Sequence, residues 1–306
     1  MREHQFMHQS VSNLAWALRS APLMLSHPKS PYKVLDEGWF QRNYLLHQDW
    51  LYALDADPEP LLEFLKTPHK LPLGKRFEQL IEFWLRESPH YTLMSNNVQL
   101  LDQKRTVGEM DFLFKENASG TFYHLEVACK FYLGYKNSKA WDHWIGPNGN
   151  DNLALKMDKL NLQLAIASTE VGKTYFDQQR WALPEPALLM KGMFFHHYTT
   201  LHQAKAPVQS AANYTSGWWV KADELDHFFA GESLWTILPK SDWLSPFESH
   251  FNELTIYKHY EMKRLCLDLL AEYNLALCVV QLYPSKLGFK EGSRGFVVPS
   301  SWPKKR

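Results

Sequence analysis

The sequence predicts an α/β protein built around a mixed β-sheet that is flanked by helices. Segments with helical periodicity alternate with short apolar runs typical of strands, and turn residues separate them. The chain has 306 residues, of which 45% are hydrophobic and 22% charged, so it can form a large core. We expect a single domain over residues 1–306, with a core at about 73–200, an N-terminal helical extension at 1–72 and a C-terminal α/β extension at 201–306.

The overall charge is balanced, because 33 Lys and Arg residues face 33 Asp and Glu residues. This balance excludes the strongly basic field of many nucleic-acid-binding proteins, although a local patch is compatible with it. Residues 286–306 hold such a patch, with a single acid, Glu291; a solubilising tail is the simplest interpretation. Its basic residues are Lys286, Lys290, Arg294, Lys304, Lys305 and Arg306.

The cysteine pattern and the apolar runs exclude several protein classes. The three cysteines are far apart and form no CxxC or Cys/His pattern, which argues against a disulfide framework or a zinc finger. No apolar run reaches the roughly 20 residues that span a bilayer, and residues 1–16 lack a signal-peptide core. We therefore expect a cytoplasmic protein that does not act in a membrane.

The first third of the chain is predicted to form helices. Residues 9–25 form an amphipathic segment that breaks near Pro22, and residues 58–67 form a short helix between prolines. Residues 73–88 give the clearest helix, because apolar residues recur there at spacings of three and four. These residues are Phe77, Leu80, Ile81 and Trp84.

The most informative stretch is a predicted β-hairpin at residues 107–131, which follows a candidate strand at 91–101. Two apolar runs flank a turn-like segment at 116–120. Side chains on a strand repeat with period two, so Glu109 and Asp111 share one face of the first strand. One face of the second strand carries His124, Glu126, Ala128 and Lys130. Buried carboxylates are costly unless they are paired or bind a metal, so this face is the strongest chemical clue in the chain.

Residues 151–167 form a predicted helix after a loop rich in Gly, Pro and Asn. Lys156, Lys159 and Gln163 line one side of this helix at spacings of three and four. They form either an ordinary solvated surface or a strip of donors for phosphate oxygens.

The second half continues the α/β pattern. Strands are expected at 187–196, 217–220, 233–238 and 275–282, and a further strand after a loop within 288–303. Helices are expected at 222–230 and 258–273.

A helix with a glutamate, a strand, a hairpin with acidic residues and a lysine, and then a helix is the element order of the PD-(D/E)XK nuclease core. The chain resembles the uncharacterised bacterial family called domain of unknown function 1853, which is itself similar to a remote branch of those nucleases. The resemblance covers nearly the whole chain. It is carried by LAWALRSAPLML, GKRFEQLIEFWL, GEMDFLF, HLEVACKFYLG, WIGPNGNDNLALKMDKLNLQ and GFKEGSRGFVVPSSWP.

The resemblance implies a restriction-endonuclease-like core and a catalytic set. Glu78 takes the place of the helical glutamate, Asp111 that of the strand aspartate and Glu126 that of the acid in (D/E)XK. The sequence departs from the motif at Ala128, where a lysine is expected, and Lys130 lies two residues further along the same face. Asp111 and Glu126 are then expected to bind Mg²⁺ or Mn²⁺, which prefer oxygen ligands.

Three interpretations remain open at this point. The first is a metal-dependent nuclease in which Lys130 orients water or offsets phosphate charge, and the donors at 156–163 hold the nucleic-acid backbone. The second is an inactive protein that kept the fold and binds DNA or RNA. The third is a structural or interaction protein in which Asp111, Glu126 and Lys130 form a salt-bridge cluster.

Overall fold

The computed structural model describes residues 5–26, 32–67, 71–103, 105–201, 205–229, 232–250 and 255–303. The strands are β1 (Lys33–Val34), β2 (Tyr91–Asp102), β3 (Arg105–Glu116), β4 (Phe122–Gly134), β5 (Trp144–Ile145), β6 (Glu185–His197), β7 (Ser216–Lys221), β8 (Leu234–Leu238), β9 (Tyr257–Lys258), β10 (Leu277–Ser285) and β11 (Gly288–Val298). The helices are α1 (Gln9–Arg19), α2 (Glu37–Ala56), α3 (Glu59–Leu65), α4 (Leu73–Glu87), α5 (Leu153–Ala165), α6 (Glu170–Gln179), α7 (Leu225–Phe228) and α8 (His259–Tyr273).

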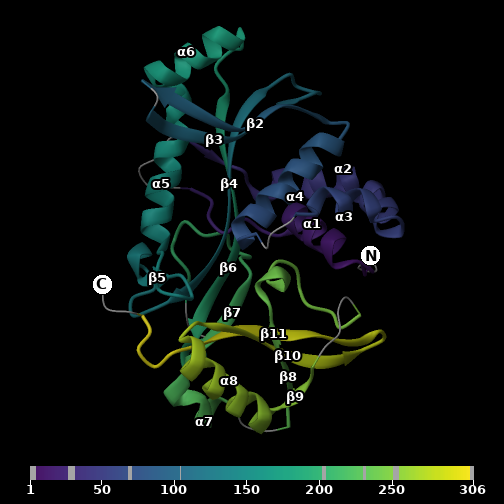
Figure 1. Cartoon of the computed structure of the whole chain (residues 1–306), viewed down its shortest axis with the longest axis vertical. Coiled ribbons are helices and arrows are strands. Elements are labelled where there is room, and N and C mark those ends of the chain that lie inside the picture. Colours follow the sequence, from purple (N-terminus) through teal and green to yellow (C-terminus); the bar gives the residue numbers. More distant parts are fainter. Residues whose placement is uncertain are drawn as a thin grey trace.

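The strands join one mixed sheet with the order β2-β3-β4-β6-β7-β11-β10-β8-β9, while β1 pairs with β6 and β5 with β4. Strands β2, β3 and β4 are antiparallel, whereas β4, β6, β7 and β11 run parallel to one another. The chain crosses from β4 to the parallel strand β6 through α5 and α6, as Figure 1 shows. This arrangement confirms the predicted α/β class with a mixed sheet and flanking helices.

Helices cover both faces of the sheet. Helix α4 packs on one face, where Phe77 and Ile81 join Leu125 of β4 in a hydrophobic cluster that also includes residues of α1, α2 and α3. Helix α5 packs on the opposite face, where Met157 contributes to a second cluster with Ala128 of β4. Figure 1 shows α4 and α5 on the two sides of β4. The alternating side chains of β4 are therefore divided between these two layers.

Most elements predicted from the sequence are confirmed with small shifts at their ends. The predicted helix 73–88 ends at Glu87, and the predicted helix 151–167 begins at Leu153 after its cap Asn152. The helix expected at 222–230 is a single short α-helix, α7, preceded by a 3₁₀ turn. No helix within the described parts of the chain is both long and apolar enough to cross a membrane.

Hydrophobic periodicity does not predict α2, although it is a helix of 20 residues. The helix begins after Asp36, whose carboxylate accepts a hydrogen bond from the Trp39 amide at 2.8 Å. Its buried face includes Asn43 and His47, and His47 Nε2 lies 2.6 Å from the Ser88 hydroxyl. Polar residues on the buried side obscure the amphipathic pattern, and partners from elsewhere in the fold make their burial possible.

Candidate active site

The predicted hairpin contains a point at which its two strands part. Backbone pairing between β3 and β4 covers Phe112–Lys115 and Phe122–Leu125. Beyond these residues β3 stays paired with β2, and β4 stays paired with β6. Asp111 and Glu126 are the first residues past the last backbone pair, and we call this position the fork.

Side-chain hydrogen bonds replace the backbone ladder at the fork. The Asp111 amide donates to Glu126 Oε1 at 3.3 Å, and the Val127 amide donates to Asp111 Oδ2 at 2.9 Å. Leu113 and His124 are direct partners in the register, so the alternation of side chains places Asp111 and Glu126 on one face. The structure therefore confirms that the two predicted acidic residues come together.

Both fork carboxyl groups are buried. Asp111 is 8% exposed and Glu126 is 0% exposed. Burial raises the pKa of Asp111 to about 7, and the charge of Glu126 adds to this rise. Burial also raises the pKa of Glu126 to about 7. Two neighbouring carboxyl groups whose pKa values are raised in this way titrate as a pair.

His124 is a member of the site to which the sequence pattern assigns no role. Its Nε2 lies 2.9 Å from Glu126 Oε1, and burial lowers the pKa of His124 to about 4. The ring is therefore neutral near neutral pH, and its Nε2 donates to Glu126 when that carboxyl group is ionised. Glu126 Oε2 and His124 Nδ1 are buried without a hydrogen-bond partner in the described chain. The fork thus retains an oxygen that can bind a ligand.

Lys130 does not form an ion pair with either fork carboxylate within the described residues. Its ammonium group instead lies 2.6 Å from Asp151 Oδ2, and each of these two side chains is 33% exposed. The backbone of Lys130 is closely approached by Gly192 of β6, where an added Cβ would lie 1.7 Å from the Lys130 carbonyl oxygen. Lys130 therefore lies on a tightly packed pair of strands, four residues along β4 from Glu126, with its ammonium group on Asp151.

Lys156 of α5 is the lysine whose charge acts on both fork carboxyl groups. Its positive charge lowers the pKa of Asp111 and of Glu126, against the larger effect of burial. The pKa of Lys156 itself is lowered by burial and by the charge of Lys130, so Lys156 deprotonates more readily than an exposed lysine. Lys156, one of the predicted phosphate donors, therefore lies close enough to the fork for its charge to affect both carboxyl groups.

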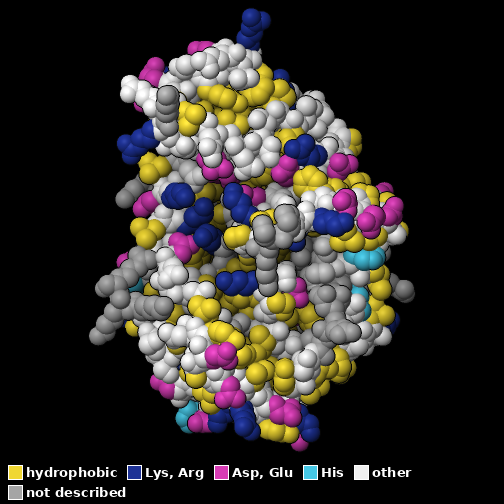
Figure 2. Space-filling model, in the orientation of Figure 1, with side chains coloured by type: hydrophobic (Ala, Val, Ile, Leu, Met, Phe, Trp, Pro, Cys, Tyr) yellow, Lys and Arg dark blue, Asp and Glu magenta, His cyan; other side chains and the backbone are white. Residues whose placement is uncertain are grey.

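The other two predicted donors of α5 differ in their surroundings. Lys159 is exposed, whereas Gln163 is half-buried and its Oε1 has no hydrogen-bond partner in the described chain. Figure 2 shows Lys and Arg side chains gathered on the molecular surface over α5 and between α5 and α4. Basic side chains thus gather locally beside α5 although the net charge of the chain is zero.

Glu78 approaches the fork from the α4 layer. It forms an ion pair with Lys75, and burial, with help from the charge of Asp111, raises the pKa of Glu78. Lys75 lies near enough that the charges of Asp111 and Glu109 act to raise its pKa. Glu78 is therefore close to the acidic pair and makes its direct contact with Lys75.

The chemistry of the fork fits a hard divalent cation held by few protein ligands. The described residues contain no group of three His, Cys, Asp or Glu side chains arranged around a metal position. Asp111 and Glu126 nevertheless offer two carboxyl groups, and Glu126 Oε2 is unpartnered. Mg²⁺ commonly binds one or two carboxylates and fills its other positions with water and phosphate oxygens.

Comparisons with known proteins identify a family and no characterised relative. Neither the curated proteins nor the solved structures contain a match. The family model described as domain of unknown function (DUF1853) matches residues 12–298, which include the fork, α4, α5 and the C-terminal strands through the end of β11. The chain therefore belongs to the DUF1853 family.

Proposed function

We propose that this protein is a metal-dependent nuclease that hydrolyses phosphodiester bonds of DNA or RNA. The observation that carries the proposal is the fork, where two buried carboxyl groups meet beside a half-buried lysine and leave a buried carboxylate oxygen unpartnered. Such perturbed carboxyl groups at one position are typical of functional sites.

The order of the elements around the fork supports the proposal. Helix α4, strand β2, the hairpin β3–β4 and helix α5 follow one another in the chain, which is the order of the PD-(D/E)XK core. We therefore propose a restriction-endonuclease-like core at about residues 73–200. Fold analogy alone does not establish activity, so the argument rests on the groups at the fork.

Asp111 and Glu126 would hold Mg²⁺ or Mn²⁺. When bound, the ion would polarise the scissile phosphate and acidify a coordinated water. His124 keeps Glu126 oriented by donating to its Oε1, and Val127 fixes Asp111 through its amide. The unpaired side of Glu126 would face the ion.

Lys156 would offset negative charge on the reacting phosphate, because its charge already acts on both fork carboxyl groups. Lys130 is a second candidate for this role. To fill it, the Lys130 ammonium group would have to leave Asp151 or act while still paired with it. Glu78 would act through Lys75, its partner at the edge of the site. Lys159 and Gln163 would contact the nucleic-acid backbone without reading its sequence.

A nucleic-acid-binding protein without catalysis is the alternative. The pairing of Lys130 with Asp151 favours it, because the lysine nearest to the expected motif position is engaged elsewhere. The purely structural interpretation is less well supported, since Lys130 does not neutralise the fork. We propose the cytoplasm as the compartment, in keeping with three buried cysteines that form no disulfide.

The test is cleavage of linear, nicked, branched and single-stranded DNA and of RNA in Mg²⁺ or Mn²⁺. We expect metal-dependent cleavage by the wild type and a loss of at least ~100-fold in Asp111→Asn, which keeps an oxygen for the Val127 amide. Asp177→Asn is the matched control, because Asp177 is exposed on α6.

Lysine variants then separate the two candidate cations. Lys156→Ala should lower cleavage by at least ~10-fold and Lys130→Ala by less, with exposed Lys33→Ala as the control. Binding without cleavage of any substrate, unchanged in Asp111→Asn, would support the alternative function.

A further inference from the structure

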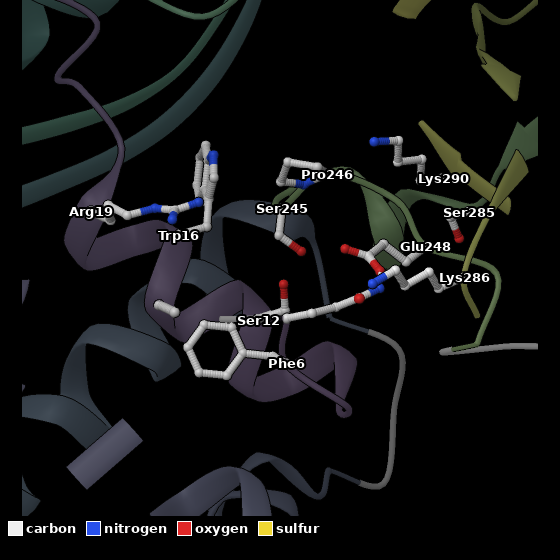
Figure 3. A pocket seen from close by; sticks show the side chains of 12 residues that line it. Phe6, Ser12, Trp16, Arg19, Ser245, Pro246, Glu248, Ser285, Lys286 and Lys290 are labelled. Carbon is white, nitrogen blue, oxygen red and sulfur yellow. The ribbon is translucent and has the colours of Figure 1, made fainter. Parts of the chain in front are cut away.

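A cavity whose lining includes no residue of the fork lies between α1 and the turn that joins β10 to β11. The cavity has a volume of about 510 Å³, which is within the usual range for small-molecule sites. Figure 3 shows Trp16 and Arg19 on the α1 side, with Lys286 and Lys290 on the side of the hairpin. Trp16 is mostly buried in the core, and the 8% of its surface that is exposed lies at this cavity, on the wall opposite the two lysines.

Cations outnumber acids in this cavity. Arg19, Lys286 and Lys290 line it, and its single acidic side chain is Glu248, which already contacts Gln5 and His250. The lysines belong to the basic patch at 286–306, for which a solubilising tail is the simplest interpretation. Their place in a cavity beside an aromatic ring instead favours a binding role.

Buried hydrogen bonds build the floor of the cavity before any ligand is present. Arg294 donates to the carbonyl oxygens of Trp243 and Ser245, the latter at 2.8 Å. The Ser245 hydroxyl donates to Asn13 of α1 at 2.8 Å. Segment 243–245 is therefore tied both to β11 and to α1, and a ligand would not have to order this wall.

We propose that this cavity binds a nucleoside phosphate. Arg19, Lys286 and Lys290 would bind the phosphate groups, as cationic donors do, and the base would pack against Trp16. Glu248 would accept a hydrogen bond from a sugar hydroxyl or a base amine. A free nucleotide and the phosphorylated end of a nucleic-acid strand share this chemistry. The proposal does not require catalysis at the fork.

The test is isothermal titration calorimetry of the full chain with adenosine monophosphate, adenosine triphosphate, inorganic phosphate and a short 5′-phosphorylated single strand. We expect nucleotide binding that weakens by at least ~10-fold in the double variant Lys286→Ala/Lys290→Ala. Lys33→Ala/Lys205→Ala removes two exposed lysines elsewhere and should leave binding unchanged. Asp111→Asn should also bind normally, which separates this site from the fork.

The results of the titrations distinguish a free nucleotide from a strand end, and some results would overturn the proposal. Binding of the mononucleotides supports a free nucleotide. Binding of the strand alone supports a strand end in this cavity if Lys286→Ala/Lys290→Ala weakens it and Asp111→Asn does not. The proposal is overturned if no nucleotide or strand binds, or if inorganic phosphate binds as tightly as the nucleotides. It is also overturned if the Lys286/Lys290 variant, shown to be folded by circular dichroism, binds like the wild type.

Discussion

Glu291 of β11 and Glu126 of β4 lie on strands of the same sheet, but their carboxylates have opposite surroundings. Glu291 Oε2 lies 2.7 Å from Arg294 Nη2 and accepts a hydrogen bond from the Phe247 amide at 2.8 Å. Glu126 is more deeply buried, its nearest acidic neighbour is Asp111, and no ion pair with Lys or Arg neutralises it in the described chain.

The difference separates a buried charge that is satisfied within the fold from one that is not. Arg294 and Glu291 satisfy each other, so their burial requires no further ligand. The charge of Glu126 raises the pKa of Asp111, and Glu126 Oε2 lacks a partner in the described chain. Protonation stabilises a site of the second kind at low pH, and we propose that a cation stabilises it at higher pH.

The largest expected effect comes from breaking the satisfied pair. Arg294→Met removes a buried cation, leaves Glu291 without its ion-pair partner and leaves two carbonyl groups without their Arg294 donor, so it should cost ~3–5 kcal/mol in the free energy of unfolding. Urea denaturation measures this cost. Lys130→Met, which breaks a partly exposed pair with Asp151, should cost less than ~1 kcal/mol. Equal losses in the two variants would contradict this comparison.

Removing negative charge from the fork should increase the stability of the protein, in contrast to the loss expected for Arg294→Met. The pKa of Glu126 is raised in the folded chain, so folding is favoured at low pH and this advantage is lost as the pH rises from about 4.5 to about 7. Glu126→Gln should therefore stabilise the metal-free protein at about pH 8, on the order of 1–3 kcal/mol, and have little effect at about pH 5.

Urea denaturation in EDTA at both pH values measures this stabilisation. Glu170→Gln is the control, because Glu170 is exposed on α6 and pairs only at the surface with Lys173. A Glu126→Gln protein that is less stable than the wild type at the higher pH would show that the fork carboxylate is structurally satisfied.

A smaller change, in the pKa values of the fork carboxyl groups, should reveal which lysine acts on them. Lys156→Met removes the positive charge that lowers the pKa of both carboxyl groups, so the titration of the pair should move to higher pH. Carbon-13 NMR of the Glu126 carboxyl group should show a shift of a fraction of a pH unit or more. Lys130→Met should shift it less, and the reverse order would restore Lys130 as the principal cation.

Sequence patterns predicted the meeting of Asp111 and Glu126 because the period of a strand decides which side chains share a face. They also predicted α4 and α5, whose buried faces are almost wholly apolar. They did not predict α6, which buries only Gly172 and Phe176 and therefore lacks an apolar stripe.

The partners of the lysines could not be predicted in the same way. Helical spacing places Lys156, Lys159 and Gln163 on one side of α5, but the packing of α5 on β4 decides which of them turns towards the fork. The ion pair of Lys130 with Asp151 depends on the path of the long loop that follows β4. His124 is recognisable only once Glu126 is known to be buried beside it.

Binding of Mn²⁺ to the fork tests the central claim most directly. Electron paramagnetic resonance would count bound Mn²⁺ in the wild type, Asp111→Asn and Glu126→Gln at about pH 8 and about pH 6, because a proton and a cation compete for the same pair. The account predicts one bound ion in the wild type, at least ~10-fold weaker binding at the lower pH, and loss of the ion in both variants. Absence of binding at the higher pH, or equal binding by all three proteins, would contradict it.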